Sequence, residues 1–168
     1  MPKTKKLVFL SLLTALAIVV YVIEAQLPVL VPIPGVKLGL SNMVSLSTLL
    51  IFGPGACLSV LMLRIVLGSL LTGSISAMFF SLAGGLLSNL GMIALYWLFK
   101  KHISIWVISI IGSILHNVGQ LLVAALIIHN LKIYYYLPIL LISGIITGFF
   151  VGLGAHFIQK QFKKLNII

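Results

Sequence analysis

The apolar stretch from Ile75 to Phe99, ISAMFFSLAGGLLSNLGMIALYWLF, decides the fold class of this protein. A transmembrane helix rises about 1.5 Å per residue and needs roughly 20 residues to cross a hydrocarbon core of about 30 Å. The stretch reaches that length without a charged residue. We therefore expect a membrane-spanning helix here.

Five further apolar runs extend this pattern over the whole chain. The 168 residues are 61% hydrophobic and only 7% charged, whereas soluble domains carry about 25% charged residues. The sequence therefore predicts one integral membrane domain, residues 1–168, folded as an all-α bundle of six transmembrane helices. The five runs extend from Leu7 to about Leu27, Leu38 to Phe52, Ala56 to Leu71, Ile103 to Ile128 and Leu137 to Ile158.

Two neighbouring runs, 38–52 and 56–71, are short for a membrane crossing. Their joint, Phe52-Gly-Pro-Gly55, is a tight turn signal without charge. The two helices could form a hairpin that stops inside the protein or one that spans fully. We expect full crossings, because polar residues at the ends can extend both helices.

The basic residues indicate the orientation in a cell membrane. Six crossings place both termini on one side, and cytoplasmic loops are enriched in Lys and Arg, so we expect both termini to be cytoplasmic. Most of the basic residues lie at the ends of apolar runs, which argues against a nucleic-acid partner. Lys3, Lys5, Lys6, Lys100, Lys101, Lys160, Lys163 and Lys164 fall on one side, and Lys37 and Lys132 on the other.

The scarcity of acids and cysteines excludes several kinds of site. Glu24 is the single acid and Cys57 the single cysteine, so paired carboxylates, a multi-carboxylate Mg²⁺ site and an internal disulfide are excluded. No G-x4-G-K-[ST] phosphate loop is present. We therefore predict no catalytic residues, no metal site and no cofactor, and any ATP hydrolysis belongs to partner subunits.

Arg64 is the most informative polar residue, because it falls near the middle of its run. A guanidinium there costs at least about 2.5 kcal/mol on insertion scales. Helix depths place Glu24 well above Arg64, so a direct pair would need a kink or an offset. Backbone carbonyls, water or an anionic ligand are the other partners, and Arg64 is either ligand-facing or structural.

Further polar residues are expected at the depth of Arg64. His116 and Gln120 are four residues apart and share a helix face. These groups either line a pocket or act as hydrogen-bonding contacts between helices, and we favour the pocket. The candidate substrate-binding residues in the membrane interior are Arg64, Asn89, His116, Asn117 and Gln120.

The first outer loop, residues 26–42, is both apolar and stiff. Its prolines forbid helix, which predicts an ordered flap folded over the outer mouth of the bundle. Lys37, Ser41 and Asn42 at its end could reach an occluded ligand, and Lys37 and Asn42 are counted as substrate-binding candidates. The alternative is an anchor at the lipid headgroups. The prolines are Pro28, Pro32 and Pro34.

Small residues form a stripe, Gly144-x3-Gly148-x3-Gly152, on the last run. Such stripes let helix backbones approach closely in lipid. We expect the stripe to pack within one molecule, and a dimer seam is the less favoured alternative.

Several sequence motifs, in the order in which they occur along the chain, resemble those of the Gx transporter family. That family is often labelled heptaprenyl diphosphate synthase component I, and it is similar to the membrane substrate-binding (S) components of energy-coupling-factor vitamin transporters. The resemblance covers essentially the whole chain and is most specific from Pro34 to Ser88. The motifs are Pro34-Gly-Val-Lys-Leu-Gly-Leu-Ser-Asn42, Phe52-Gly-Pro-Gly55, Arg64-Ile-Val-Leu-Gly68, Thr72-Gly73 and Ser81-Leu-Ala-Gly-Gly-Leu-Leu-Ser88.

The resemblance implies six helices, an outer loop that closes over a small ligand, and a transmembrane coupling subunit with ATPase subunits as partners. In S components an Ala-x3-Ala face of the first helix docks the coupling subunit. The corresponding residues here are Ser11 and Ala15, with Ser in place of the first Ala.

The function expected first is therefore capture and transport of a small, possibly anionic or amphipathic substrate. The rivals are a non-catalytic membrane accessory for polyprenyl diphosphate or quinone synthesis and a purely structural assembly subunit.

Overall fold

The computed structural model describes residues 1–26, 37–99 and 102–164, and this part of the chain is helical without a β-strand. The all-α prediction is confirmed. The elements in chain order are α1 (Lys3–Glu24), α2 (Asn42–Phe52), α3 (Pro54–Thr72), α4 (Ile75–Phe99), α5 (Ile105–Ile128), the 3-10 helix η2 (Leu131–Tyr136) and α6 (Leu137–Lys164).

Five of the described helical segments are long and apolar enough to cross a membrane: α1, α3, α4, α5 and the joined η2–α6 segment. The multi-pass character expected from the sequence is thus supported. Helix α2 differs, because its 11 residues rise only about 16 Å. A full crossing by the run 38–52 cannot be made by α2 alone and would need the segment before it.

The turn between α2 and α3 forms where the sequence places it. Gly53 ends α2 with a φ of 87°, a conformation that favours glycine. Pro54 follows at the first position of α3, where its missing N–H costs no helical hydrogen bond.

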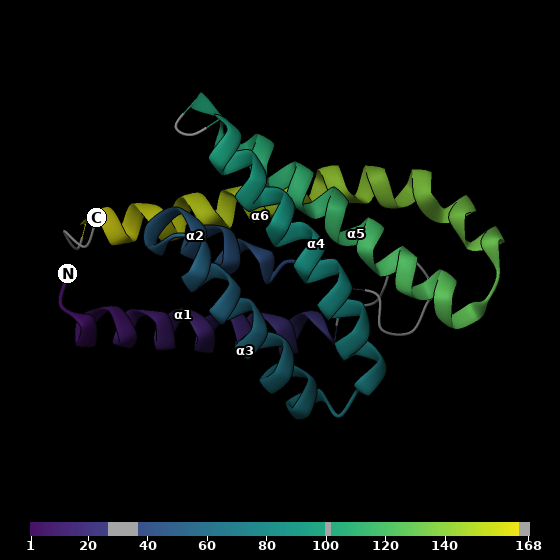
Figure 1. Cartoon of the computed structure of the whole chain (residues 1–168), viewed down its shortest axis with the longest axis horizontal. Coiled ribbons are helices and arrows are strands. Elements are labelled where there is room, and N and C mark those ends of the chain that lie inside the picture. The colour runs from purple at the N-terminus through teal and green to yellow at the C-terminus, as the bar shows by residue number, and fades with distance from the viewer. Residues whose placement is uncertain (27–36, 100–101, 165–168) are drawn as a thin grey trace.

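Helix α2 lies inside the bundle and contacts every other α-helix of the described chain. Around it, α1 packs on α3, while α5 packs between α4 and α6 (Figure 1). The start of α1 and the end of α6 lie at the same end of the molecule (Figure 1). The rings of Phe9 and Phe162, 5.3 Å apart, join them there.

The glycine stripe of α6 packs against α5 of the same molecule. A Cβ added at Gly148 would lie 2.5 Å from Ile110 Cα, and one at Gly144 would lie 3.0 Å from Ile114 Cγ1. Side chains at these positions would push the helices apart. The expectation of packing within one molecule is confirmed.

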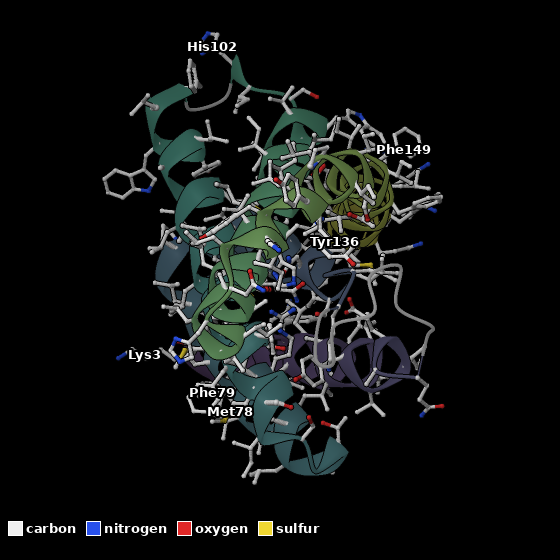
Figure 2. The ribbon with its side chains drawn as sticks, turned by 90° about the vertical axis from the view of Figure 1, so that its right-hand side faces the viewer. Lys3, Met78, Phe79, His102, Tyr136 and Phe149 are labelled. Carbon is white, nitrogen blue, oxygen red and sulfur yellow. The ribbon has the colours of Figure 1, made fainter. Side chains whose placement is uncertain are left out.

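The bundle has an apolar outer surface and contains a group of polar side chains at its centre, beside its hydrophobic core clusters. Phe79 and Phe149 are each 51% exposed and lie at its periphery, whereas nitrogen and oxygen atoms gather between the helices at its centre (Figure 2). Arg64 is only 1% exposed. This distribution suits a lipid environment, where the outer surface needs no polar groups and the interior satisfies the polar ones.

Candidate functional site

The site is organised by the segment 37–41, which leads into α2. Glu24, near the end of α1 and 4% exposed, accepts hydrogen bonds from this segment with both carboxylate oxygens. Oε1 accepts from the backbone N–H groups of Gly39 and Leu40, the second at 3.2 Å. Oε2 accepts from the N–H and the hydroxyl of Ser41, each at 3.5 Å. The carboxylate therefore ties the end of the outer loop to α1.

Gly39 gives this segment its close approach to α5. Its φ is 82°, in the region that side chains disfavour. A Cβ at this position would lie 2.8 Å from His116 Cδ2. Both the backbone conformation and the contact therefore require glycine at position 39.

Arg64, on α3, donates to the two residues that begin α2. Nη1 donates to Ser41 Oγ and, at 3.4 Å, to Asn42 Oδ1, and Nη2 donates to the same Oδ1 at 3.3 Å. The Asn42 amide in turn donates to Ser88 Oγ on α4 at 3.5 Å. In this structure the terminal nitrogens of Arg64 thus bind the end of the outer loop.

The Ser41 hydroxyl lies between Glu24 and Arg64. It donates to Glu24 Oε2 and accepts from Arg64 Nη1, so the acid and the guanidinium are connected through one side chain. Helix depths predicted that a direct pair would need a kink or an offset, and in the structure the two groups are connected through Ser41. Ser41 and Asn42 were not predicted as the partners of Arg64.

Lys37 is buried, with 8% of its surface exposed, and its side chain is held differently. Its backbone N–H donates to Gln120 Oε1 at 3.2 Å. Its Nζ lies 3.2 Å from the centroid of the Tyr21 ring and has no hydrogen-bond partner in the described part of the chain. Burial lowers the pKa of the Lys37 ammonium.

The ring contact does not balance the burial of the Lys37 charge. A desolvated cation–π contact is worth about 2 kcal/mol, whereas burying an ion costs several kcal/mol. The Tyr21 ring is itself fixed, because its hydroxyl forms hydrogen bonds of 3.1 Å with both Ser69 and Ser81. The ammonium thus lies on a rigid aromatic face without a counter-charge.

His116 and Gln120 join this cluster from α5. The Gln120 amide is oriented by Lys37 N, which donates to its oxygen, so its Nε2 is left to donate to His116 Nε2 at 3.0 Å. Both side chains are buried. The shared face predicted for these two residues is confirmed.

Two of the predicted site residues form hydrogen bonds elsewhere. Asn89 donates to Gly85 O and accepts from Cys57 Sγ, both at 2.8 Å. Asn117 donates to Leu140 O on α6, also at 2.8 Å. Their amide groups therefore connect helices. Lys37, Asn42, Arg64, His116 and Gln120 form the buried cluster with Glu24, Ser41 and Tyr21.

Glu24, Tyr21 and Ser41 are members of the cluster that were not counted among the candidate substrate-binding residues. A lone acid within an apolar helix was the available signal, because a buried carboxylate needs hydrogen-bond donors. Tyr21 is one helical turn earlier, on the same face. Its role under Lys37 depends on where the outer loop ends, which no local pattern reveals.

Groups that could hold a metal ion are absent from the described residues, where no three His, Cys, Asp or Glu side chains come together. The prediction that the protein uses no metal is not tested by this observation.

A groove of about 460 Å³ runs along the outer surface between α1 and α3. Ser11 and Ala15 line it, together with Ser59, Leu63 and Leu67 of α3. Both predicted docking residues are exposed, so they lie on the open surface of the molecule.

Comparison with known proteins places the chain in a family. The heptaprenyl diphosphate synthase component I family matches residues 13–158, a range that contains every residue of the buried cluster. No curated protein and no solved structure matches the chain. The resemblance noted from the sequence motifs is confirmed at the level of this family. The chain belongs to the heptaprenyl diphosphate synthase component I family.

Proposed function

We propose that this protein is an S-component-like membrane subunit that binds a small, anionic or amphipathic substrate and mediates its transport across the cytoplasmic membrane. The observation that carries the proposal is the buried cluster of charged and amide groups at the end of the outer loop. Helix packing in lipid needs only modest hydrogen bonds between small polar groups. Two buried cations and an acid exceed that need and are typical of a substrate pathway.

Retention of a ligand is the direct test of this function. We expect the purified full-length protein to keep a stoichiometric small molecule, visible by native mass spectrometry. A preparation from native membranes that retains no small molecule, and that carries no substrate with any partner, contradicts the proposal.

The proposed orientation has six crossings and both termini in the cytoplasm. The common position of the first and last helix ends (Figure 1) and the basic residues near them support it. Reporter fusions at Lys101 and at the C-terminus should read cytoplasmic, and one near Lys132 external. A cytoplasmic reading at Lys132 contradicts the orientation.

We further propose that the groove between α1 and α3 docks a transmembrane coupling subunit, which works with ATPase subunits. The groove is lined by the small residues Ser11 and Ala15, and small residues permit close helix contacts in lipid. Ala15→Leu should reduce co-purification of the partner by tenfold or more and leave the isolated protein folded. Val19→Leu, also exposed on α1 but not among the groove residues, is the control. Undiminished co-purification of the Ala15 variant excludes this face.

A second candidate function is a non-catalytic accessory for polyprenyl diphosphate or quinone synthesis, which the family description favours. Prenyl transfer requires Mg²⁺ held by carboxylates, and Glu24 is the single acid, so the chain would need a catalytic partner. Co-purification of a prenyl synthase without a retained small molecule supports this function over transport.

A further inference from the structure

The buried cluster contains one positive charge that no residue of the chain can balance. Arg64 and Lys37 are cationic, Glu24 is the one acid of the whole sequence, and all three are buried. Both oxygens of Glu24 already accept from residues 39–41, and Arg64 is connected to it through Ser41. The surplus charge therefore belongs to Lys37.

The sequence of the outer loop confirms that no other side chain supplies the missing charge. Residues 27–36 read Leu-Pro-Val-Leu-Val-Pro-Ile-Pro-Gly-Val and contain no charged or hydrogen-bonding side chain. Within the described residues, the ammonium of Lys37 has a ring face as its neighbour and no hydrogen-bond acceptor. A buried ion in this state favours any partner that brings an opposite charge.

We propose that the Lys37 ammonium anchors a single negative charge of the substrate, so that the substrate class is a monoanion such as a carboxylate on an apolar or aromatic body. This rests on the proposed binding function and names its ligand class. Arg64 is not the anchor, because its terminal nitrogens are engaged by Ser41 and Asn42. A flexible lysine stem lets the ammonium leave the Tyr21 ring, and the exposed ring face then receives the apolar body.

The charge balance also discriminates between ligand classes. A monoanion neutralises the cluster, whereas a diphosphate would replace one surplus positive charge by an excess of buried negative charge. A neutral molecule would leave the Lys37 charge as it is. The inference thus separates a carboxylate substrate from a prenyl diphosphate at the same position.

The test uses the full-length protein in detergent and simple probes of matched shape. Benzoate and 1-naphthoate carry one charge, benzamide and 1-naphthamide carry none, and phenyl phosphate carries about two. We expect at least one carboxylate to raise the thermal unfolding temperature and to bind at least tenfold more tightly than its amide. Phenyl phosphate should bind more weakly than benzoate.

Lysine variants locate the effect. Lys37→Met should remove the preference for carboxylate over amide. Lys37→Arg keeps the charge and should retain that preference, and it serves as the second variant where the Met variant folds poorly. Lys132→Met, at an exposed lysine, is the matched control and should bind as the unchanged protein does. Equal binding of acids and amides, tighter binding of phenyl phosphate, or an unchanged preference in Lys37→Met overturns the inference.

The monoanion assignment and the proposed binding function are contradicted by different experimental results. A retained small molecule that is neutral or multiply charged overturns the monoanion assignment and leaves transport supported. Absence of any retained molecule from native membranes contradicts the binding function itself. A retained monoanion that is lost in Lys37→Met and kept in Lys132→Met supports both.

Discussion

Arg64 and Lys37 are both buried cations of the cluster, yet their partners differ. We call Arg64 with its partners the Arg64 side of the cluster, and Lys37 with the Tyr21 ring the Lys37 side. The Arg64 guanidinium donates to Ser41 and Asn42 and is connected through Ser41 to Glu24. The Lys37 ammonium lies on the Tyr21 ring and has no acceptor among residues 1–26, 37–99 and 102–164. A buried charge with hydrogen-bond partners holds structure together, whereas one without them is available to a ligand. The comparison therefore predicts opposite consequences for changes on the two sides.

Glu24→Gln should have the largest effect, because it removes the single acid of the sequence, which is connected to Arg64 through Ser41. Two buried cations would then lack an acid, and we expect a loss of about 3–5 kcal/mol in stability. Thermal and denaturant unfolding of the purified protein measure it. Combining Glu24→Gln with Arg64→Met should recover part of the loss, and a double variant less stable than either single one contradicts the assigned connection.

Arg64→Gln should break the Arg64 side alone. Ser41, Asn42 and Glu24 would lose a charged donor, which costs about 2–3 kcal/mol, while carboxylate binding by the folded fraction persists. Lys37→Met should show the reverse, with binding lost and stability kept. Unfolding and binding measured on the same preparations decide between these outcomes. An Arg64→Gln protein of unchanged stability that loses binding would make Arg64 a ligand residue.

Gly39→Ala should disturb the segment that joins the two sides. The positive φ and the approach to His116 together predict a loss of about 2 kcal/mol. Gly73→Ala is the matched control, because Gly73 also has a positive φ but no atom within 4 Å of an added Cβ. Equal losses in the two variants, measured by thermal unfolding, would show that the His116 contact contributes nothing.

A change of pH should have the smallest of these effects. It should alter the affinity for an anion bound at Lys37. Anion binding requires the charged ammonium, so affinity is full at low pH and falls as pH rises through the Lys37 pKa. Burial lowers that pKa, so the fall should begin below the usual lysine value of about 10.4. The groups facing this region are Tyr21 and Glu24 on α1, Arg64 on α3 and His116 on α5. Benzoate affinity that is constant up to pH 10 contradicts this expectation.

The helices and the turn could be predicted from the sequence, because the patterns that indicate them are local. Long uncharged runs predict membrane helices, and the turn at Gly53 and Pro54 is present where its dipeptides indicate. Helix α2 is shorter than the run 38–52 that was expected to cross, because it begins only at Asn42. The run 38–52 carries no charged residue, but the backbone N–H groups of Gly39 and Leu40 near its start are bound to Glu24 instead of continuing the helix.

The candidate site was predicted in part. Helix spacing and depth located His116, Gln120 and Arg64, because polar residues in an apolar run are conspicuous. Asn89 and Asn117 have the same signal, yet their amides bond to Cys57, Gly85 and Leu140. Residue type and depth do not show which way a side chain faces around its helix. They therefore do not distinguish a residue of the buried cluster from one that forms its hydrogen bonds elsewhere.

Composition and run length are properties of the chain, so they already predict an all-helical membrane protein with one acid and an excess of basic residues. The burial of Lys37, and which buried cation has hydrogen-bond partners, depend on tertiary packing. The end of the outer loop lies against Glu24, Arg64 and Gln120, and these residues come from three different helices. Hydrogen bonds act over about 3 Å, so partners far apart in the chain are assigned only when packing brings them together.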